Sequence, residues 1–208
     1  MSPAVQHLDT DYLILGAGAM GMAFADVIID EDPTARIVIV DRHANPGGHW
    51  NDVYPFVRLH QPAEFYGLNS TPLGHGGADL SSGAEIVAYF RRAMDRFLAT
   101  GRVRFLPMSD YQGDGRIVSL VDPDRVTTVT AMRRVVDGTF STVTVPSVRP
   151  PSYTVDPGVT LIPPNGLAKV AHPPQRYVVV GAGKTGMDAI LFLLDNDVAP
   201  ERIQWVVP

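Results

Sequence analysis

The 208-residue sequence contains no cysteine. This absence excludes a catalytic thiol, a redox-active disulfide, a zinc site with cysteine ligands and an iron–sulfur cluster. The six histidines do not fall in pairs at the spacing that places two ligands on one helix face, so we predict no metal site.

Basic patches and long apolar runs are also lacking. The chain carries 17 Lys and Arg against 22 Asp and Glu, whereas nucleic-acid binders show a basic patch or stripe. No stretch approaches the uninterrupted apolar length that spans a bilayer, and the N-terminus MSPAVQHLDTD lacks the basic start and apolar stretch of a signal peptide. With 45% hydrophobic residues, the composition indicates a globular protein with a real core. We therefore expect a cytoplasmic protein that binds neither nucleic acid nor membranes.

The sequence does contain one pattern twice. An apolar run, a glycine-rich turn and a helical segment follow each other in DYLILGAGAMGMAFADVIID and again in RYVVVGAGKTGMDAILFLLDN. Each is completed by another apolar run, IVIV at 37–40 and IQWVV at 203–207. A buried strand, a helix and a second buried strand in this order indicate a βαβ unit. The sequence therefore predicts an α/β protein with a duplicated module.

The segment between the two modules is mixed. Residues 43–75 are irregular and rich in Pro, Gly, His and aromatic residues, as in long functional loops. Residues 82–100 have helical spacing and open with the capping box Ser82-x-x-Glu85. A strand is expected at 103–106.

Farther along, the pattern changes. Short β-branched runs at 117–145, separated by Asp-Pro-Asp and Asp-Gly, predict an antiparallel meander. Residues 146–174 are rich in proline and form the best linker candidate.

The first glycine turn fits G-x-G-x-x-G with Gly16, Gly18 and Gly21. In a dinucleotide site the first glycine permits the tight turn, the second lets the backbone approach a pyrophosphate, and the third lets the helix pack on the strand. Asp41 follows 20 residues after the last glycine, at a strand end where a carboxylate binds ribose hydroxyls. The alternative is a turn that uses glycine for packing alone.

The second glycine turn has the same spacing at Gly181, Gly183 and Gly186. Lys184 invites a phosphate-loop interpretation, but the first glycine of G-x-x-x-x-G-K-[ST] is missing, which disfavours an NTPase. A packing turn again remains an alternative. Two dinucleotide modules in one chain imply two bound dinucleotides, or one together with a vestigial site. The first case favours hydride transfer from a nicotinamide to a bound flavin.

These motifs together resemble those of two-dinucleotide-binding flavoproteins, and among them the flavin-containing and Baeyer–Villiger monooxygenase-like oxidoreductases. The resemblance is carried by GAGAMG with Asp41-Arg42, by Gly47-Gly48-His49-Trp50 followed by Tyr54-Pro55, and by GAGKTGMD, which is similar to the family's G-x-G-x-S-G-x-D motif. It spans essentially the whole chain.

The resemblance implies that FAD lies on the first module. Residues expected to bind it are Gly16, Gly18, Met20, Gly21, Asp41, Arg42, Gly48, His49, Trp50, His60, Gln61 and the backbone near Met108. NADPH or NADH is expected on Gly181, Gly183, Lys184, Thr185 and Gly186, with Asp188 supporting the helix start. For Trp50 the alternative is a role in core or loop packing, and for His60 it is a structural histidine with its hydrogen bonds satisfied within the protein.

The implied organisation is a Rossmann-like FAD-binding domain with an antiparallel meander at 1–148, a linker at 149–174, and the first strand–helix–strand of an NAD(P)-binding domain at 175–208. The expected function is reduction of the flavin by NAD(P)H, with monooxygenase-like oxygen transfer to a small organic substrate and no assigned catalytic side chain. The alternative is a truncated or partial dinucleotide-binding protein without independent catalysis, as a homo-oligomer or completed by a second chain.

Overall fold

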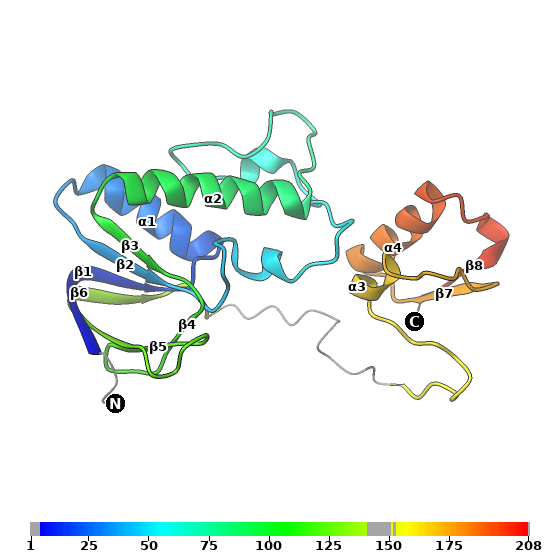
Figure 1. Ribbon diagram of the computed structural model, residues 1–208. Helices are drawn as coiled ribbons and strands as arrows, with labels where there is room; N and C mark the ends of the chain where they lie inside the picture. Colours follow the sequence, from blue (N-terminus) through cyan, green and yellow to red (C-terminus); the bar gives the residue numbers. More distant parts are fainter. Residues whose placement is uncertain (1–4, 141–150, 152, 208) are drawn as a thin grey trace.

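A computed structural model describes residues 5–140, 151 and 153–207 (Figure 1). Its main feature is a mixed six-stranded sheet in the order β3-β2-β1-β6-β5-β4. The strands are β1 (Val5–Leu15), β2 (Ile37–Val40), β3 (Val103–Leu106), β4 (Ser109–Tyr111), β5 (Arg116–Ser119) and β6 (Val126–Asp137). β1 pairs in parallel with both β2 and β6, and β2 pairs in parallel with β3, whereas β4, β5 and β6 are antiparallel. The α/β prediction is confirmed.

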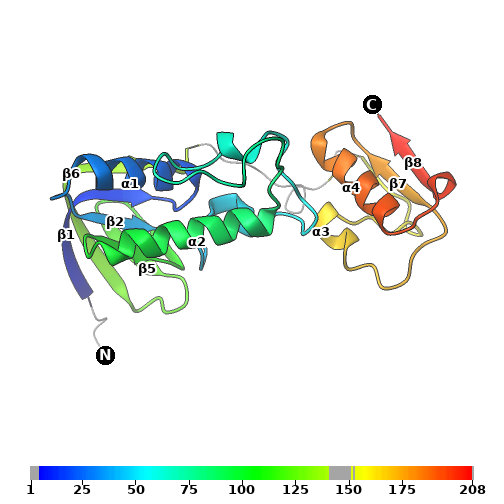
Figure 2. The same ribbon diagram turned by 90° about the horizontal axis from the view of Figure 1, so that it is seen from above.

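The two faces of the sheet are covered differently. Helices α1 (Ala19–Glu31) and α2 (Gly83–Ala99) lie on one face, where Met22 and Phe90 share a buried cluster with Ile14 of β1 (Figures 1 and 2). Leu13, one residue earlier on β1, points to the other face and packs with Ile117 of β5. The continuous apolar runs of β1 and β2 are explained by this burial on both faces.

Helix α2 begins where its sequence predicts. The side chain of Ser82 accepts a hydrogen bond from the backbone of Glu85, and the Glu85 carboxylate accepts one from the Ser82 backbone at 2.7 Å. The backbone and side-chain hydrogen bonds from Ser82 lower the pKa of Glu85. The capping box thus satisfies amides at the helix start that have no intrahelical partner.

The expected meander is confirmed only in part. β4, β5 and β6 do form an antiparallel ladder, but the runs VTTVTAM and RRVV are one strand, β6, and not two. β1 offers an eleven-residue edge, and β6 pairs along it with a register shift opposite Asp11 that accommodates one extra residue. The predicted run at 141–145 lies outside the described residues.

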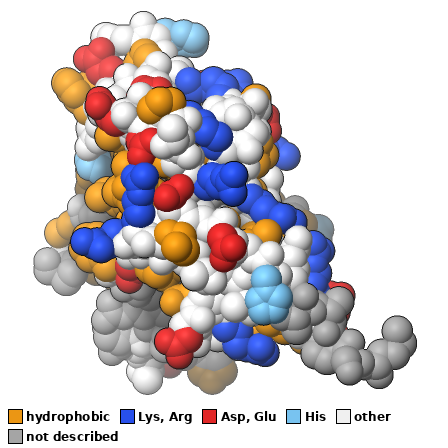
Figure 3. Space-filling view, turned by 90° about the vertical axis from the view of Figure 1, so that its left-hand side faces the viewer, with side chains coloured by type: hydrophobic (Ala, Val, Ile, Leu, Met, Phe, Trp, Pro, Cys, Tyr) orange, Lys and Arg blue, Asp and Glu red, His pale blue; other side chains and the backbone are white. Residues whose placement is uncertain are grey.

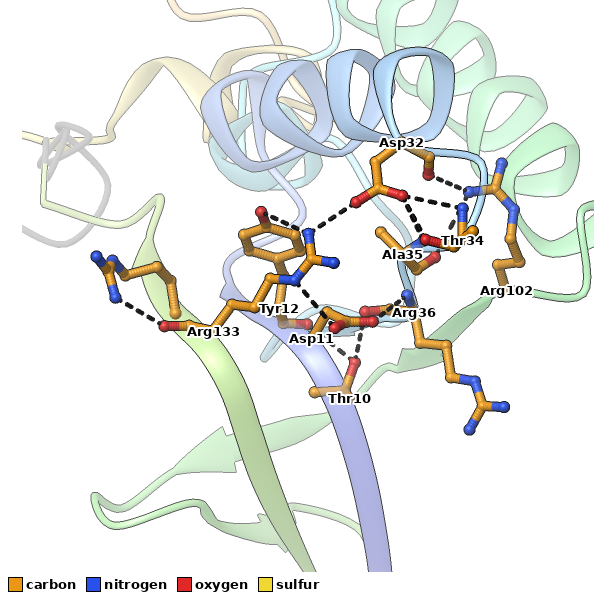
Figure 4. A network of polar contacts seen from close by, with 10 residues as sticks. Thr10, Asp11, Tyr12, Asp32, Thr34, Ala35, Arg36, Arg102 and Arg133 are labelled. Carbon is orange, nitrogen blue, oxygen red and sulfur yellow. Dashed lines mark hydrogen bonds and ion pairs between the residues drawn. The ribbon is translucent and has the colours of Figure 1, made fainter.

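The register shift lies beside a polar network at the amino end of β2 (Figure 4). Arg133 pairs with Asp11 at 3.2 Å and with Asp32 at 2.7 Å, and Arg102 donates to the α1 carbonyl of Ile29 at 3.0 Å. Hydrogen bonds from Thr34, followed by those from Arg133, hold the pKa of Asp32 well below its usual range. The network binds the C-terminal end of α1 to the neighbouring strands. The glycine turn lies elsewhere, directly after the C-terminal end of β1.

The C-terminal segment forms the second strand–helix–strand as predicted. β7 (Tyr177–Val180) and β8 (Ile203–Val206) pair in parallel and flank α4 (Lys184–Asp195), with a 3-10 turn at Pro200–Arg202. The predicted linker contains one helical turn, α3 (Pro164–Leu167). Within the described residues, no helix is long and apolar enough to cross a bilayer.

The face of the sheet domain in Figure 3 intersperses basic side chains with acidic and apolar ones.

Candidate dinucleotide sites

Two of the three glycines in the first turn are required by the protein itself. Gly16 has φ +90°, and a Cβ there would lie 2.8 Å from Thr139. A Cβ on Gly21 would lie 2.0 Å from the carbonyl oxygen of Gly16, so α1 packs this closely on β1 only with glycine at that position. The packing interpretation therefore accounts for Gly16 and Gly21.

Gly18 is different. Its φ of −78° suits any residue, and the nearest atom to a Cβ there is the Gly48 Cα at 3.6 Å, an ordinary contact. Neither backbone conformation nor protein packing requires glycine. Gly18 is also the N-cap of α1, and the first turn of this helix holds no acidic residue that would repel an anion from its positive end. These are the features expected where an anionic ligand approaches the backbone.

Two further segments enclose the first turn. The amide of Gly47 donates to the Ala17 carbonyl at 2.8 Å, and Gly48 lies so close that a Cβ on it would be 2.9 Å from the Gly18 Cα. On the other side, Gly138 after β6 donates to the Leu15 carbonyl at 2.8 Å. The structure thus brings the predicted Gly48 to the first turn. It also adds Gly138, which the sequence predicted only as part of a turn between two runs of the meander.

Asp41 lies at the end of β2, buried at 7% exposure, and its carboxylate binds the first turn directly. Oδ2 accepts from the Ala17 amide at 2.6 Å, and Oδ1 accepts from the His43 amide at 2.7 Å and faces His43 Nδ1 at 2.9 Å. A carboxylate has about four acceptor positions, so one on Oδ2 remains for a ligand. Asp41 therefore stabilises the first glycine turn and is also a candidate acceptor for a ribose hydroxyl.

His43 is the residue that the sequence did not single out. Its Nδ1 faces Asp41, and its Nε2 faces Asp52 Oδ2 at 2.8 Å. Partial burial lowers the pKa of His43, but the hydrogen bonds to Asp52 and Asp41 outweigh this and raise it above 6.5. Both partners are carboxylates, and the charged imidazolium is the form of the ring that can donate to both of them. The only sequence signal was the spacing Asp-x-His directly after a buried strand.

Three other residues predicted to contact FAD, Met108, Arg42 and Met20, differ in how close they lie to the end of β2 and in their exposure. The amide of Met108 donates to the His43 carbonyl at 3.1 Å and that of Ser109 to the Asp41 carbonyl at 2.9 Å, which places Met108 beside the β2 end. Arg42 is exposed and lies 3.8 Å from Asp110. Met20, on the first turn of α1, is largely exposed.

The aromatic part of the motif is mainly structural. Trp50 is buried in the cluster beneath α2, and its indole donates to the Tyr66 hydroxyl at 2.7 Å. Burial lowers the pKa of the neighbouring His49, which therefore favours the neutral ring. His60 is exposed and Gln61 partly buried, and both follow Arg58 on a segment that contacts the second turn.

The second glycine turn repeats the first with less around it. A Cβ on Gly186 would lie 2.6 Å from the Gly181 carbonyl oxygen, as at Gly21. Gly183, the N-cap of α4, has φ −74°, and no atom of the described residues lies within 4 Å of its Cβ position. Thr185 lies in the first turn of α4, which again holds no acidic residue. Gly183 thus parallels Gly18.

The ammonium of Lys184 binds groups that lie outside the glycine turn. It donates to the carbonyl of Arg58 and to the carboxylate of Asp188. Asp188 also accepts a hydrogen bond from the Tyr54 hydroxyl at 2.7 Å. Asp188 was expected to support only the helix start, but it contacts a loop 134 positions away in the sequence.

A separate pocket of about 180 Å³ lies between α2 and the loop before it. Its charged lining includes Arg96 and Glu85, but Arg96 donates to Ser70 and Glu85 caps α2. We assign no cofactor to it. Among the described residues, no three His, Asp or Glu side chains come together in an arrangement that could hold a metal ion.

Similarity to known proteins extends along nearly the whole chain, although no protein-family model matches it. An uncharacterized protein of Mycobacterium tuberculosis is 50% identical over 212 residues, covering 97% of this chain and 39% of the relative. The FAD-containing monooxygenase EthA of Mycolicibacterium smegmatis is 25% identical over 196 residues, covering 91% of this chain and 40% of EthA.

Solved structures agree on the fold. A flavin-containing monooxygenase from Stenotrophomonas maltophilia superposes with a TM-score of 0.64 at 20% identity, over 96% of this chain and 58% of that one. The protein OTEMO, solved in complex with FAD and NADP, gives a TM-score of 0.57 at 21% identity over 94% of this chain and 38% of OTEMO. The chain resembles the N-terminal portion of flavin-containing and Baeyer–Villiger monooxygenases in fold and, distantly, in sequence. Its six-stranded sheet matches their FAD-binding region, and it spans about 39% of the length of the M. tuberculosis relative.

Proposed function

We propose that this chain is the cofactor-binding portion of a flavin-dependent monooxygenase-type oxidoreductase, with FAD on the first glycine turn and NADPH or NADH on the second. The observation that carries the proposal is the pair Gly18 and Gly183. Each is an N-cap glycine that neither backbone conformation nor packing requires, and each stands at the position where the dinucleotide motif needs close approach of a pyrophosphate.

The first module would hold FAD through its own backbone and Asp41. The α1 amides beyond Gly18 would bind the pyrophosphate, and the remaining acceptor position of Asp41 would bind a ribose hydroxyl. Gly48 would line the same phosphates, and the backbone near Met108 would approach the adenine. Met20, Arg42, His49, Trp50, His60 and Gln61 complete the proposed set, with Trp50 acting through the packing beneath the loop.

The second module would hold the nicotinamide nucleotide through Gly181, Gly183, Thr185 and Gly186. The chemistry that the bound cofactors supply is hydride transfer to the flavin and oxygen transfer to a small organic substrate. The contribution of this chain is to orient the two nucleotides relative to each other. The proposed division is a FAD-binding domain at 1–148, a linker at 149–174 and part of an NAD(P)-binding domain at 175–208.

The second candidate is a dinucleotide-binding chain without independent turnover, completed by a second copy or another chain. It is favoured by the 39% coverage of the M. tuberculosis relative, which leaves most of that protein without a counterpart in this chain. The substrate pocket would then be built largely by the completing partner.

The two candidates are separated by one titration. The purified chain is mixed with FAD, freed of excess by gel filtration, and treated with NADPH and then NADH without oxygen. We expect a retained yellow chromophore that bleaches. Retained flavin that does not bleach would support the second candidate. A chain that takes up no FAD would refute both.

A further inference from the structure

The loop at 52–58 and helix α4 meet in what we call the docking contact, formed by Tyr54, Phe56 and Arg58 of the loop with Lys184, Asp188 and Phe192 of the helix. Phe56 stacks on Phe192 with ring centroids 4.2 Å apart and planes at 21°. Beside them, the side chain of Asn165 in α3 donates to the Asp52 carbonyl at 2.9 Å. In Figures 1 and 2 this loop is the part of the sheet domain that reaches toward α3 and α4.

The three helix residues share one face. Lys184, Asp188 and Phe192 are spaced four residues apart, and residues i, i+4 and i+8 lie one above another on an α-helix. One charged donor, one charged acceptor and one aromatic ring therefore face the loop together. Such a row is matched on the loop by a carbonyl, a hydroxyl and a second ring.

Asp188 is the centre of the contact. Its side chain is only 13% exposed and accepts from both the Tyr54 hydroxyl and the Lys184 ammonium. Burial, followed by the hydrogen bond to Asp188, raises the pKa of Tyr54, so the hydroxyl stays protonated as a donor. Hydrogen bonds from two donors to a largely buried carboxylate stabilise a contact more than an exposed ion pair does.

Lys184 occupies a position that is unfavourable for a cation. It is the first residue of α4, where the helix dipole repels positive charge, and a Lys placed before an Asp at i,i+4 is the weaker order of an ion pair. An acceptor close to the ammonium offsets this repulsion. A bound phosphate is one explanation, but in this structure the carbonyl of Arg58 and the carboxylate of Asp188 already provide two acceptors.

We propose that Lys184, Asp188 and Tyr54 are positioning residues that hold the second glycine turn against the loop at 52–58, and that Lys184 is an anchor of this contact and not a phosphate ligand. Its significance for hydride transfer rests on the proposed function, since the contact would keep the nicotinamide turn beside the segment leading to His60 and Gln61. The pyrophosphate would then be bound by backbone amides at Gly183 and the start of α4.

The docking contact is tested without any cofactor by hydrogen exchange on the full chain. Tyr54→Phe and Asp188→Asn should each raise the exchange rate of amides at 54–58 and 184–192 by about tenfold, because the first removes a hydrogen bond to a carboxylate and the second removes the charge that strengthens the hydrogen bonds from Tyr54 and Lys184. Tyr153→Phe, which removes the hydroxyl of an exposed tyrosine, is the matched control and should change neither segment. Unchanged exchange in both variants would overturn the contact.

The role of Lys184 is tested by NADPH affinity, read from nucleotide fluorescence. If Lys184 is an anchor, Lys184→Met and Asp188→Asn change the dissociation constant by the same small factor, within about threefold, while both raise hydrogen exchange. A loss of tenfold or more in Lys184→Met that Asp188→Asn does not share would identify a phosphate ligand and refute the anchor role. If the wild-type chain binds no NADPH, the proposed function fails, and the exchange experiment still decides the docking contact.

Discussion

Gly18 and Gly21, three residues apart, should respond in opposite ways to the same substitution. Replacing Gly21 with alanine puts a Cβ 2.0 Å from the Gly16 carbonyl oxygen and 3.1 Å from the Ile14 side chain. Overpacking of this kind costs up to about 3 kcal/mol, and the gain from alanine in a helix returns about 1 kcal/mol. We expect Gly21→Ala to lower the free energy of unfolding by about 2 kcal/mol.

Gly18→Ala should instead leave the fold intact. Its Cβ meets only the Gly48 Cα at 3.6 Å, and φ is −78°, so the folded state accepts it. The unfolded chain loses entropy worth about 0.4–1 kcal/mol, and the poorer N-cap preference of alanine offsets this gain, so the free energy of unfolding should change little. FAD affinity should fall about tenfold to a hundredfold, because the methyl group displaces a pyrophosphate from charge-assisted hydrogen bonds.

Both variants are measured by urea unfolding followed by circular dichroism and by FAD titration. Gly158→Ala is the control, because no described atom lies within 4 Å of its Cβ position and it is remote from either turn in sequence. The reasoning is refuted if Gly18→Ala binds FAD like the wild type, or if it destabilises the chain as much as Gly21→Ala does.

Three other outcomes are expected. Gly183→Ala should leave stability unchanged within about 0.5 kcal/mol and weaken NADPH binding about tenfold, measured by nucleotide fluorescence. Asp26→Asn should cost about 1–3 kcal/mol in urea unfolding, because the amide and the hydroxyl of Ser70 donate to different oxygens of this buried α1 carboxylate at 3.0 and 2.5 Å, and asparagine keeps only one acceptor oxygen. His43→Gln should flatten the pH dependence of stability: the folded pKa of His43 is raised, so its contribution is full below about pH 6.5 and is lost as pH rises through the folded pKa. Parallel unfolding-midpoint curves for wild type and variant between pH 6 and 9 would contradict this last prediction.

Local signals predicted the elements that depend on local physics. The capping box located the start of α2, and the all-apolar run of β2 identified a strand buried on both faces. The turn Asp122-Pro123-Asp124 likewise separated β5 from β6. In each case the deciding interactions lie within a few residues of each other, so a single sequence contains them.

The failures involve partners that are distant in the sequence. β6 is one strand because β1, more than a hundred residues earlier, offers an edge along its whole length. His43 is an exception, because its partner Asp52 is only nine positions away, but the two residues are joined by an irregular loop whose path no local pattern predicts. Asp188 looked like a helix-start residue because its partner, Tyr54, is 134 positions away. No periodicity or propensity encodes such pairings.

The same six-residue turn stands in two different surroundings. The first is enclosed by Gly47 and Gly48 on one side and by Gly138 on the other, so a nucleotide there would be covered by protein. Around Gly181 and Gly183, no atom in the described part of the chain lies within 4 Å of either Cβ position. The enclosure of the first turn therefore supports the proposed FAD position independently of the motif that the two turns share.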